Sequence, residues 1–180
     1  MSTNSEQPSR YTFSEPSTEW PRAFARECTR LEGLLGADLV VVHHVGSTSV
    51  PGLAAKPVID LVPVVQAVEK LDGPLGDVLV KAGYRAWGAY GLPGRRLFTK
   101  DRDGVRTHNL HAYAEGDPEI DRHRAFAAFL RNQEELRRDY EALKRELYRR
   151  HPASIEAYSQ GKDRWIKRIE REALEWWRSK

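Results

Sequence analysis

The sequence predicts a single α+β domain: a mixed sheet of about five strands, packed by one N-terminal helix and by C-terminal helices. Two patterns predict this class. Apolar residues recur at spacings of three and four near the start of the chain and again after Pro118, and short β-branched runs fill the region between them. Helices grouped before and after a run of strands are typical of α+β proteins.

Length and composition fit one folded unit. The chain has 180 residues, of which 40% are hydrophobic, so a sizeable core can form. We expect residues 1–15 to be a flexible arm and residues 16–180 to be the domain. The single cysteine cannot form an intramolecular disulfide, and the sequence contains neither a signal peptide nor an apolar run of roughly 18 residues. We therefore expect a cytoplasmic protein without a membrane span.

The first expected helix begins after Thr18 and ends at Gly36, where glycine can adopt a left-handed cap. Because Cys28 falls on the apolar stripe of this helix, we expect a buried thiol. The stripe comprises Trp20, Phe24, Cys28, Leu31 and Leu35.

Two apolar runs, residues 39–42 and 58–65, predict strands. Both faces of each run are apolar, and strands of this kind lie in the middle of a sheet that helices cover. The remaining elements follow from the same patterns: an interrupted helix over 66–81, strands over 84–90, 96–100 and 105–113, a hairpin turn at 101–104, and helices after Pro118 that Pro152 interrupts.

The loop between the first two strands has the composition of an anion-binding site. Small residues let backbone N–H groups approach an anion, hydroxyl groups add donors, and a lysine adds positive charge. Neither a Walker loop nor a GxGxxG motif is present, so the composition also fits a plain turn. The candidate binding residues are Gly46, Ser47, Thr48, Ser49 and Lys56.

Asp60 is the single charge in the apolar run VIDLVPVV. A buried, unpaired carboxylate is costly, so Asp60 needs a partner. The partner is either a metal ion or a cation; a structural salt bridge to Lys56 or to an arginine is the alternative. Side chains alternate along a strand, so Asp60 shares its face with Val62, and only one carboxylate is presented there.

Several motifs together resemble the GrpB family. They are GSTSVPGLAAKPVIDLV (46–62), PGRRLF (93–98), RTHNLH (106–111), and the helical segments YEALK and YSQGKDRW. The resemblance implies the nucleotidyltransferase-like fold shared with DNA polymerase beta, in which a Gly-Ser pair follows the first strand and acidic residues lie on the second. Gly46 and Ser47 match that pair, and Asp60 matches the first acid.

The resemblance implies an enzyme that binds a nucleotide or another phosphorylated or anionic substrate, with Asp60 as ligand of a divalent cation, Mg²⁺ or Mn²⁺. In this hypothesis Ser47 holds phosphates and Lys56 neutralises their charge. Val62 stands where a second acid is expected, so the acidic set is incomplete for a two-metal site. Whether catalysis is retained stays open, and the alternative is a non-catalytic nucleotide-binding or accessory module of the same fold.

Four residues complete the candidate site. His111 is, with Asp60, a candidate catalytic residue, because a histidine can bind a metal or transfer a proton near neutral pH; a hydrogen bond to substrate and a purely structural role are the alternatives. Asn109 shares its strand face with His111. Arg95 and Arg96 match the family pattern, and an arginine can bind a phosphate with two hydrogen bonds.

The charge pattern indicates the class of partner. The net charge is +3, and residues 121–180 hold 16 Lys and Arg against 11 Asp and Glu. These charges alternate in sign along expected helices, which is typical of solvated faces. We therefore expect a nucleotide or phosphorylated small molecule as partner, and neither nucleic acid nor a membrane; the oligomeric state is left open.

Overall fold

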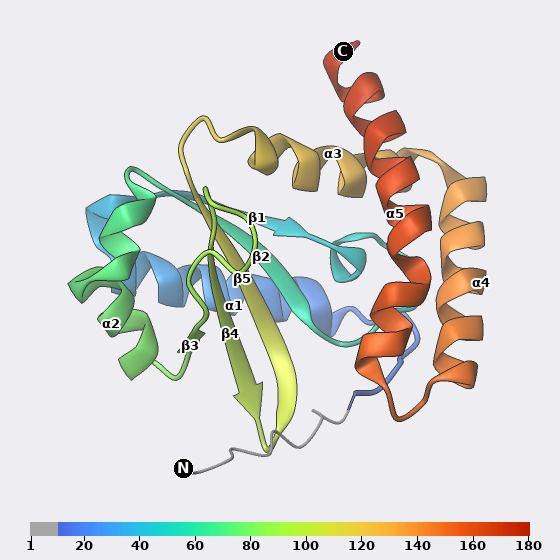
Figure 1. Cartoon of the computed structure of the whole chain (residues 1–180), viewed down its shortest axis with the longest axis horizontal. Helices are drawn as coiled ribbons and strands as arrows, with labels where there is room; N and C mark the ends of the chain where they lie inside the picture. The colour runs from blue at the N-terminus through green and yellow to red at the C-terminus, as the bar shows by residue number, and fades with distance from the viewer. Residues whose placement is uncertain (1–10) are drawn as a thin grey trace.

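A computed structural model of the protein describes residues 11–180, and its strands form one five-stranded sheet in the order β1-β2-β5-β4-β3 (Figure 1). β2 and β5 run parallel, and the other neighbours pair antiparallel. The strands are β1 (Leu39–Val45), β2 (Ile59–Val65), β3 (Arg85–Ala86), β4 (Arg96–Arg102) and β5 (Val105–Ala114). The predicted mixed sheet of about five strands is confirmed.

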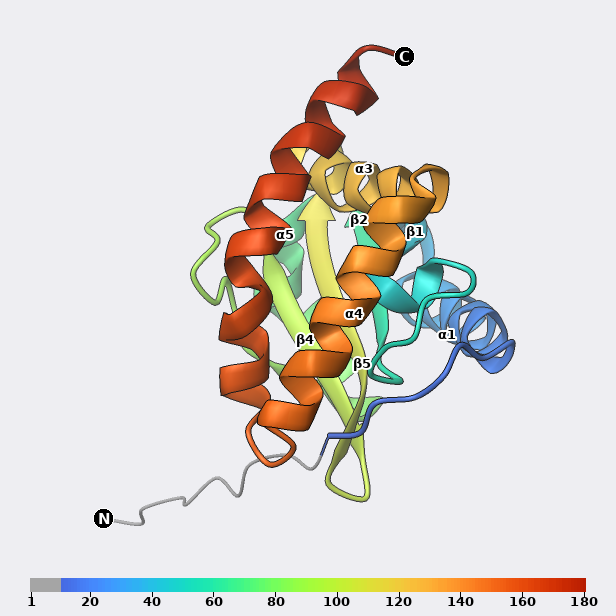
Figure 2. The same cartoon turned by 90° about the vertical axis from the view of Figure 1, so that its right-hand side faces the viewer.

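Helices cover both faces of the sheet. The core on one face includes residues of α1 and α2, whereas α3, α4 and α5 pack together on the other side, as Figure 2 shows. The described helices are α1 (Glu19–Leu35), α2 (Pro74–Lys81), α3 (Pro118–Asn132), α4 (Glu134–Arg150) and α5 (Ile155–Arg178). None of them is long and apolar enough to cross a lipid bilayer.

The alternation of side chains along β2 supplies both cores. Ile59 and Leu61 pack into the cluster beneath α1 and α2. Val62 and Val64 point the other way and pack with Tyr113 of β5. Asp60 shares the second face, as predicted, so its carboxylate lies on the side of the sheet that α3, α4 and α5 cover.

The prediction that both apolar runs lie in the middle of the sheet is wrong for the first run. β1 is an edge strand, and within the described chain it pairs with β2 alone. Val40 and Val41 are 42% and 41% exposed. β-branched residues favour strands at the edge as well as in the centre of a sheet, so the run identified the strand but not its burial.

Two predicted turns differ in their outcome. The hairpin is confirmed: Asp103 and Gly104 have φ of 52° and 75° between β4 and β5, and positive φ at both central residues is the type I′ pattern. Gly36 has φ of 52° but ψ of −130°, so it ends α1 without the left-handed helical cap that we expected.

The third predicted strand is much shorter than its apolar pattern. β3 has two residues. Trp87 and Gly88 still form backbone hydrogen bonds with Leu97 of β4, and the chain turns at Gly88 and Tyr90, which adopt positive φ. Cys28 is half-buried on α1, and burial raises the pKa of its thiol to about 11. The thiol that we expected to be buried is therefore only partly so, and it is protonated at neutral pH.

The structure describes only part of the expected arm, residues 1–15. Its first ten residues lie outside the described part of the chain, but the next five contact the fold. The ring of Tyr11 packs 5.4 Å from that of Tyr158, and Ser14 forms a backbone bridge to Ala55. The segment from Tyr11 to Glu15 therefore lies against the loop that precedes β2.

Candidate functional site

A cavity of about 240 Å³ brings most of the candidate residues together. The loop between β1 and β2 forms one wall, β2 and β5 form the floor, and α4 and α5 close it from the other side. We call it the Asp60 cavity. Its polar lining comprises Ser47, Thr48, Lys56, Asp60, Asn109, His111, Lys144, Tyr158 and Lys162.

The parallel pairing of β2 with β5 places Asp60 beside Asn109. The side-chain amide of Asn109 donates a hydrogen bond of 2.8 Å to Oδ1 of Asp60, and Nε2 of His111 lies 4.0 Å from the same oxygen. In the described chain Asp60 therefore has an amide partner, and the salt bridge to Lys56 or to an arginine that we considered is not formed.

Gly46 is required by the position of Asp60. Its φ is +68°, which disfavours any residue with a side chain. A Cβ at this position would also overlap the Asp60 carboxylate, because it would lie 3.0 Å from Cγ and closer still to Oδ2. The Gly-Ser pair after β1 thus lets the backbone approach the second oxygen of Asp60.

The structure gives Thr48 and Ser49 a different role from the expected substrate contact. Residues 47–49 form a 3₁₀ turn. The hydroxyl of Ser49 donates to the carbonyl oxygen of Gly46 at 2.8 Å, and that of Thr48 donates to the carbonyl of Val58 at 3.2 Å. Both hydroxyl hydrogens therefore hold the loop in shape. The third hydroxyl, that of Ser47, lines the cavity and is hydrogen-bonded to Tyr140.

Neither arginine lines the Asp60 cavity. Arg96 forms a two-bond ion pair with Asp72, at 2.5 and 2.6 Å. Arg95 is buried, and its guanidinium donates to the backbone oxygens of Ala89 and Tyr90. Both guanidinium groups are thus bonded to protein groups outside the Asp60 cavity, whereas we expected one of them to contact a phosphate.

Arg95 nevertheless affects the site through His111. NH1 of Arg95 lies 3.5 Å from Nδ1 of His111. A guanidinium can only donate, so Nδ1 accepts and the ring proton sits on Nε2, which faces Asp60. Burial lowers the pKa of His111 to about 4, so the ring is neutral at pH 7. In this tautomer His111 is a hydrogen-bond donor to the cavity and has no free Nε2 lone pair for a metal.

Two lysines of the C-terminal helices were not among the predicted site residues. Lys144 of α4 is 1% exposed, donates to the carbonyl of Ala54 and lies 4.5 Å from the centre of the Tyr140 ring. Lys162 of α5 lies 4.9 Å from the centre of the Tyr158 ring. The burial of Lys144 could have been predicted from the sequence, because this lysine falls one helical turn after Tyr140 on the apolar stripe of α4.

The three lysines of the cavity repel one another. Burial and the nearby Lys162 lower the pKa of Lys144 to about 7. Burial and the nearby Lys56 lower that of Lys162 to about 8, despite the attraction of Asp60. Burial also lowers the pKa of Lys56. The cavity therefore holds more cationic groups than its single carboxylate can balance.

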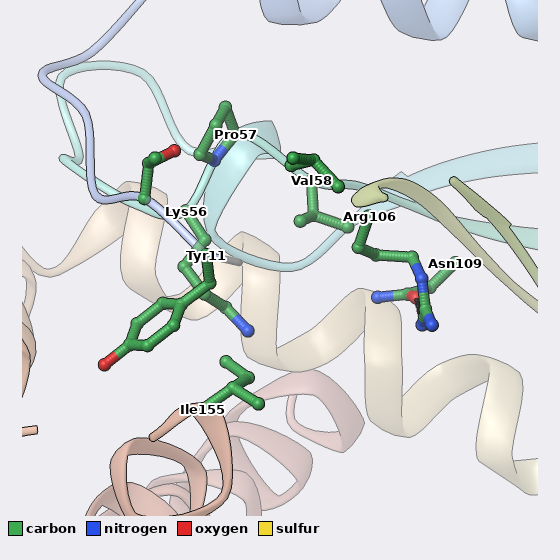
Figure 3. A pocket seen from close by; sticks show the side chains of 9 residues that line it. Tyr11, Lys56, Pro57, Val58, Arg106, Asn109 and Ile155 are labelled. Atoms are coloured by element: carbon green, nitrogen blue, oxygen red, sulfur yellow. Dashed lines mark hydrogen bonds between the residues drawn. The ribbon is translucent and has the colours of Figure 1, made fainter. Parts of the chain in front are cut away.

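A smaller cavity of about 90 Å³ adjoins this one and shares Lys56 and Asn109 with it. Figure 3 shows Tyr11, Lys56 and Ile155 on one side of it and Arg106 with Asn109 on the other. NH1 of Arg106 donates to the Asn109 oxygen at 3.2 Å. Through Asn109, this arginine is linked to the carboxylate of Asp60.

The GrpB protein family model matches residues 11–172. The chain belongs to the GrpB family. The solved structure of GrpB from Enterococcus faecalis is 40% identical, covers 92% of this chain and 99% of its own, and superimposes with a TM-score of 0.87. YqkA of Bacillus subtilis is 39% identical over 158 residues, which are 88% of this chain but 46% of YqkA, so the chain spans about half the length of that relative.

More distant structural similarity agrees with the fold that the motifs imply. A structure of the Cid1 poly(U) polymerase bound to MgATP matches with a TM-score of 0.54 at 12% identity, over 82% of this chain and 50% of Cid1. At that identity the likeness concerns the fold alone. The GrpB family membership and the nucleotidyltransferase-like fold, both predicted from the motifs, are confirmed.

Proposed function

We propose that the Asp60 cavity binds the phosphate groups of a nucleotide or a related phosphorylated small molecule. The observation that carries the proposal is the placement of three lysine ammonium groups around one carboxylate in a cavity of about 240 Å³. Phosphates are polyanions, and cavities that bind them commonly combine lysine charge with hydroxyl and backbone donors.

The lowered pKa values of the lysines support an anionic ligand. Lys144 and Lys162 titrate at about 7 and 8, so the free protein holds them only partly protonated near neutral pH. An anion in the cavity offsets burial and mutual repulsion, and it raises both pKa values. Binding of an anion is then coupled to proton uptake by the lysines. A neutral ligand would not cause this uptake.

The remaining donors suit the same ligand. His111 directs the hydrogen on Nε2 into the cavity, and Arg95 acts as a positioning residue that keeps it there. Ser47 lies at the start of the loop turn, and its hydroxyl, hydrogen-bonded to Tyr140 in the free protein, can turn toward the ligand. These neutral donors add orientation to the charge that the lysines supply.

The acidic residues do not fit a pair of metal ions. Among the described residues no group of three or more His, Cys, Asp or Glu side chains is arranged to hold a metal. Val62, fully buried, stands where a second carboxylate is needed. The surroundings of Asp60 do suit one Mg²⁺ or Mn²⁺ ion, because Mg²⁺ typically binds one or two carboxylates together with substrate phosphates, and Oδ2 of Asp60 is not used by Asn109. In this proposal the ion neutralises phosphate charge.

Nucleotidyl transfer is the second candidate function. It is favoured by the position of Gly46 and Ser47 directly after β1 and of Asp60 on β2, within a fold similar to that of Cid1. The single carboxylate and the donor tautomer of His111 favour ligand binding without transfer. Release of pyrophosphate from a nucleoside triphosphate is the assay that separates the two.

A thermal-shift series tests binding. The purified protein is heated with each of the four common ribonucleoside triphosphates, with and without MgCl₂ or MnCl₂, beside the Asp60→Asn variant and the Ser47→Ala/Lys56→Ala double variant. Stabilisation by a triphosphate that is reduced in the double variant supports the phosphate site. Loss of only the metal-dependent part in Asp60→Asn assigns the ion to Asp60. Absence of any shift argues against the proposal.

A further inference from the structure

The largest of the cavities described here, about 460 Å³, lies on the other face of the sheet, between α1, β4 and β5. We call it the α1 cavity. His108 of β5 points into it, whereas the next residue, Asn109, points into the Asp60 cavity. Successive side chains of a strand face opposite sides, so the sheet separates the two cavities.

A buried carboxylate forms part of its wall. Glu27 of α1 is 6% exposed. Its Oε1 accepts hydrogen bonds from Lys100, at 2.8 Å, and from the Tyr84 hydroxyl. Its Oε2 has no such donor in the described chain and faces Nε2 of His108 at 3.8 Å. Burial acts to raise the pKa of Glu27, but the bonds from Lys100 and Tyr84 outweigh it, and the pKa is lowered.

The proton of His108 lies on the nitrogen that faces away from Glu27. The hydroxyl of Thr107 donates to the carbonyl of Lys100 at 3.0 Å, so its oxygen accepts from Nδ1 of His108 at 2.9 Å. Burial lowers the pKa of His108, which keeps the ring neutral. Nε2 therefore presents a lone pair to the Glu27 oxygen, and two acceptors face each other with no hydrogen between them.

The rim of the α1 cavity carries charges of both signs, but its acids, Glu19 and Asp101, are paired with Arg22 and Arg106. Arg26 of α1 and Arg102 of β4 line it, and neither forms a hydrogen bond or an ion pair with any residue in the described part of the chain. The side chains of Trp20 and Ile59 add an apolar surface to the lining. The cavity thus offers an acceptor pair at one place and two free guanidinium groups at another.

We propose that the α1 cavity is a second ligand site, and that it takes a small molecule with a primary amine and a phosphate or carboxylate group. An ammonium group has three hydrogens and can donate to Glu27 and His108 together, which a hydroxyl with one hydrogen cannot do. The anionic group meets Arg26 and Arg102, where guanidinium groups bind phosphate or carboxylate oxygens in pairs. A bridging water satisfies the two acceptors but leaves both arginines without a partner.

NMR of the histidine rings tests this proposal in the full-length protein. The probe is 2-aminoethyl phosphate, and ethyl phosphate, which lacks the amine, is the matched comparison. We expect 2-aminoethyl phosphate to shift the His108 ring signals saturably. It should bind about tenfold more tightly than ethyl phosphate, because one charge-assisted hydrogen-bonded contact contributes about that much affinity. The Arg26→Ala/Arg102→Ala variant should weaken binding by about tenfold or more, because it removes both guanidinium groups that contact the phosphate. Both residues are exposed and lie outside the buried Glu27 network, so the fold should be unaffected.

The control variant is Lys162→Ala, which alters only the Asp60 cavity and should leave the His108 titration unchanged. Unshifted His108 signals at millimolar probe, or equal affinities of the two phosphates, would overturn the proposal. Binding that is lost in Lys162→Ala and retained in the arginine variant would also overturn it, because the probe would then occupy the Asp60 cavity. The phosphate site of the proposed function is tested by variants at Ser47, Lys56 and Asp60, and the α1 cavity by variants at Arg26 and Arg102. Either proposal can therefore fail while the other holds.

Discussion

The amide of Asn109 donates a hydrogen bond of 2.8 Å to Oδ1 of Asp60, its register partner across the parallel β2–β5 pair. The bond fixes the orientation of the carboxylate, and because an amide is neutral it adds no charge, so that the charge of Asp60 is balanced by the lysines of the cavity. This relationship explains how the Asp60 cavity keeps one oriented carboxylate where a metal-dependent transferase would present several.

Replacing Asn109 with aspartate should create a divalent-cation site. Asn109→Asp places a second carboxylate within hydrogen-bond distance of Asp60, and two adjacent carboxylates bind hard cations more strongly than one. We expect MnCl₂ to raise the melting temperature of this variant more than that of the wild type, and we expect no gain in the control Asn109→Ala. Equal responses of all three proteins would show that the two side chains do not share a ligand.

The stability of the free protein should rise with pH above 7. Folded Lys144 and Lys162 titrate at about 7 and 8, and a lysine ordinarily titrates at 10.5. Between these values the unfolded chain binds more protons than the folded protein, so the free energy of unfolding increases with pH. Urea unfolding at pH values between 7 and 9 measures the slope; near pH 10 the buried tyrosines, whose folded pKa values are raised, act in the opposite direction.

A matched pair of variants isolates this effect. Lys144→Met should make the slope shallower, because it removes one of the two titrating groups. Lys167→Met should leave the slope unchanged, because Lys167 is an exposed residue of α5 that pairs with Asp163. A slope that both variants preserve would contradict the low pKa of Lys144.

Gly46→Ala should destabilise the protein by about 1–3 kcal/mol through its positive φ alone, and the overlap with Asp60 adds to this cost. In an Asp60→Gly background the overlap is removed, so the same alanine substitution should cost less. Chemical unfolding of the four proteins gives the coupling between the two positions. Purely additive free energies would show that the Gly46 backbone and the Asp60 carboxylate do not contact each other.

Tyr158→Phe should leave stability unchanged or raise it by about 1 kcal/mol. The Tyr158 hydroxyl is buried without a hydrogen-bond partner in the described chain, and an unsatisfied buried hydroxyl lowers stability. Its ring, which lies beneath the ammonium groups of Lys56 and Lys162, is kept in phenylalanine. A loss of stability would reveal a partner for the hydroxyl. Tyr140→Phe provides the contrast, because the buried Tyr140 hydroxyl is hydrogen-bonded to Ser47.

The fold was largely predictable from the sequence because its signals are local. Helical spacing located α1 and the C-terminal helices, and Asp103 with Gly104 located the hairpin. The edge position of β1 was not predictable from its own residues, because strand order depends on which strands pair. The short β3 reflects backbone conformations at Gly88 and Tyr90 that an apolar pattern does not report.

The candidate site was predictable where its residues are close in the sequence. The loop from Gly46 to Lys56 and Asp60 belong to one continuous segment, and Ser47, Thr48, Lys56 and Asp60 of this segment line one cavity. Lys144 and Lys162 come from α4 and α5, and their approach to Asp60 depends on how these helices pack. Arg96 was expected at the site because it matches the family pattern, but in the structure it pairs with Asp72, outside the cavity.

The most direct test of the phosphate site is isothermal titration of ATP, with MgCl₂ present, into the wild type and into Lys56→Ala/Lys162→Ala. The account predicts saturable binding by the wild type. It predicts net proton uptake at pH 8, which is measured by comparing buffers of different ionisation enthalpy. It also predicts an affinity at least about a hundredfold lower in the double variant, because two charge-assisted contacts are lost. Equal affinity of the two proteins, or no saturable binding by the wild type, would contradict it.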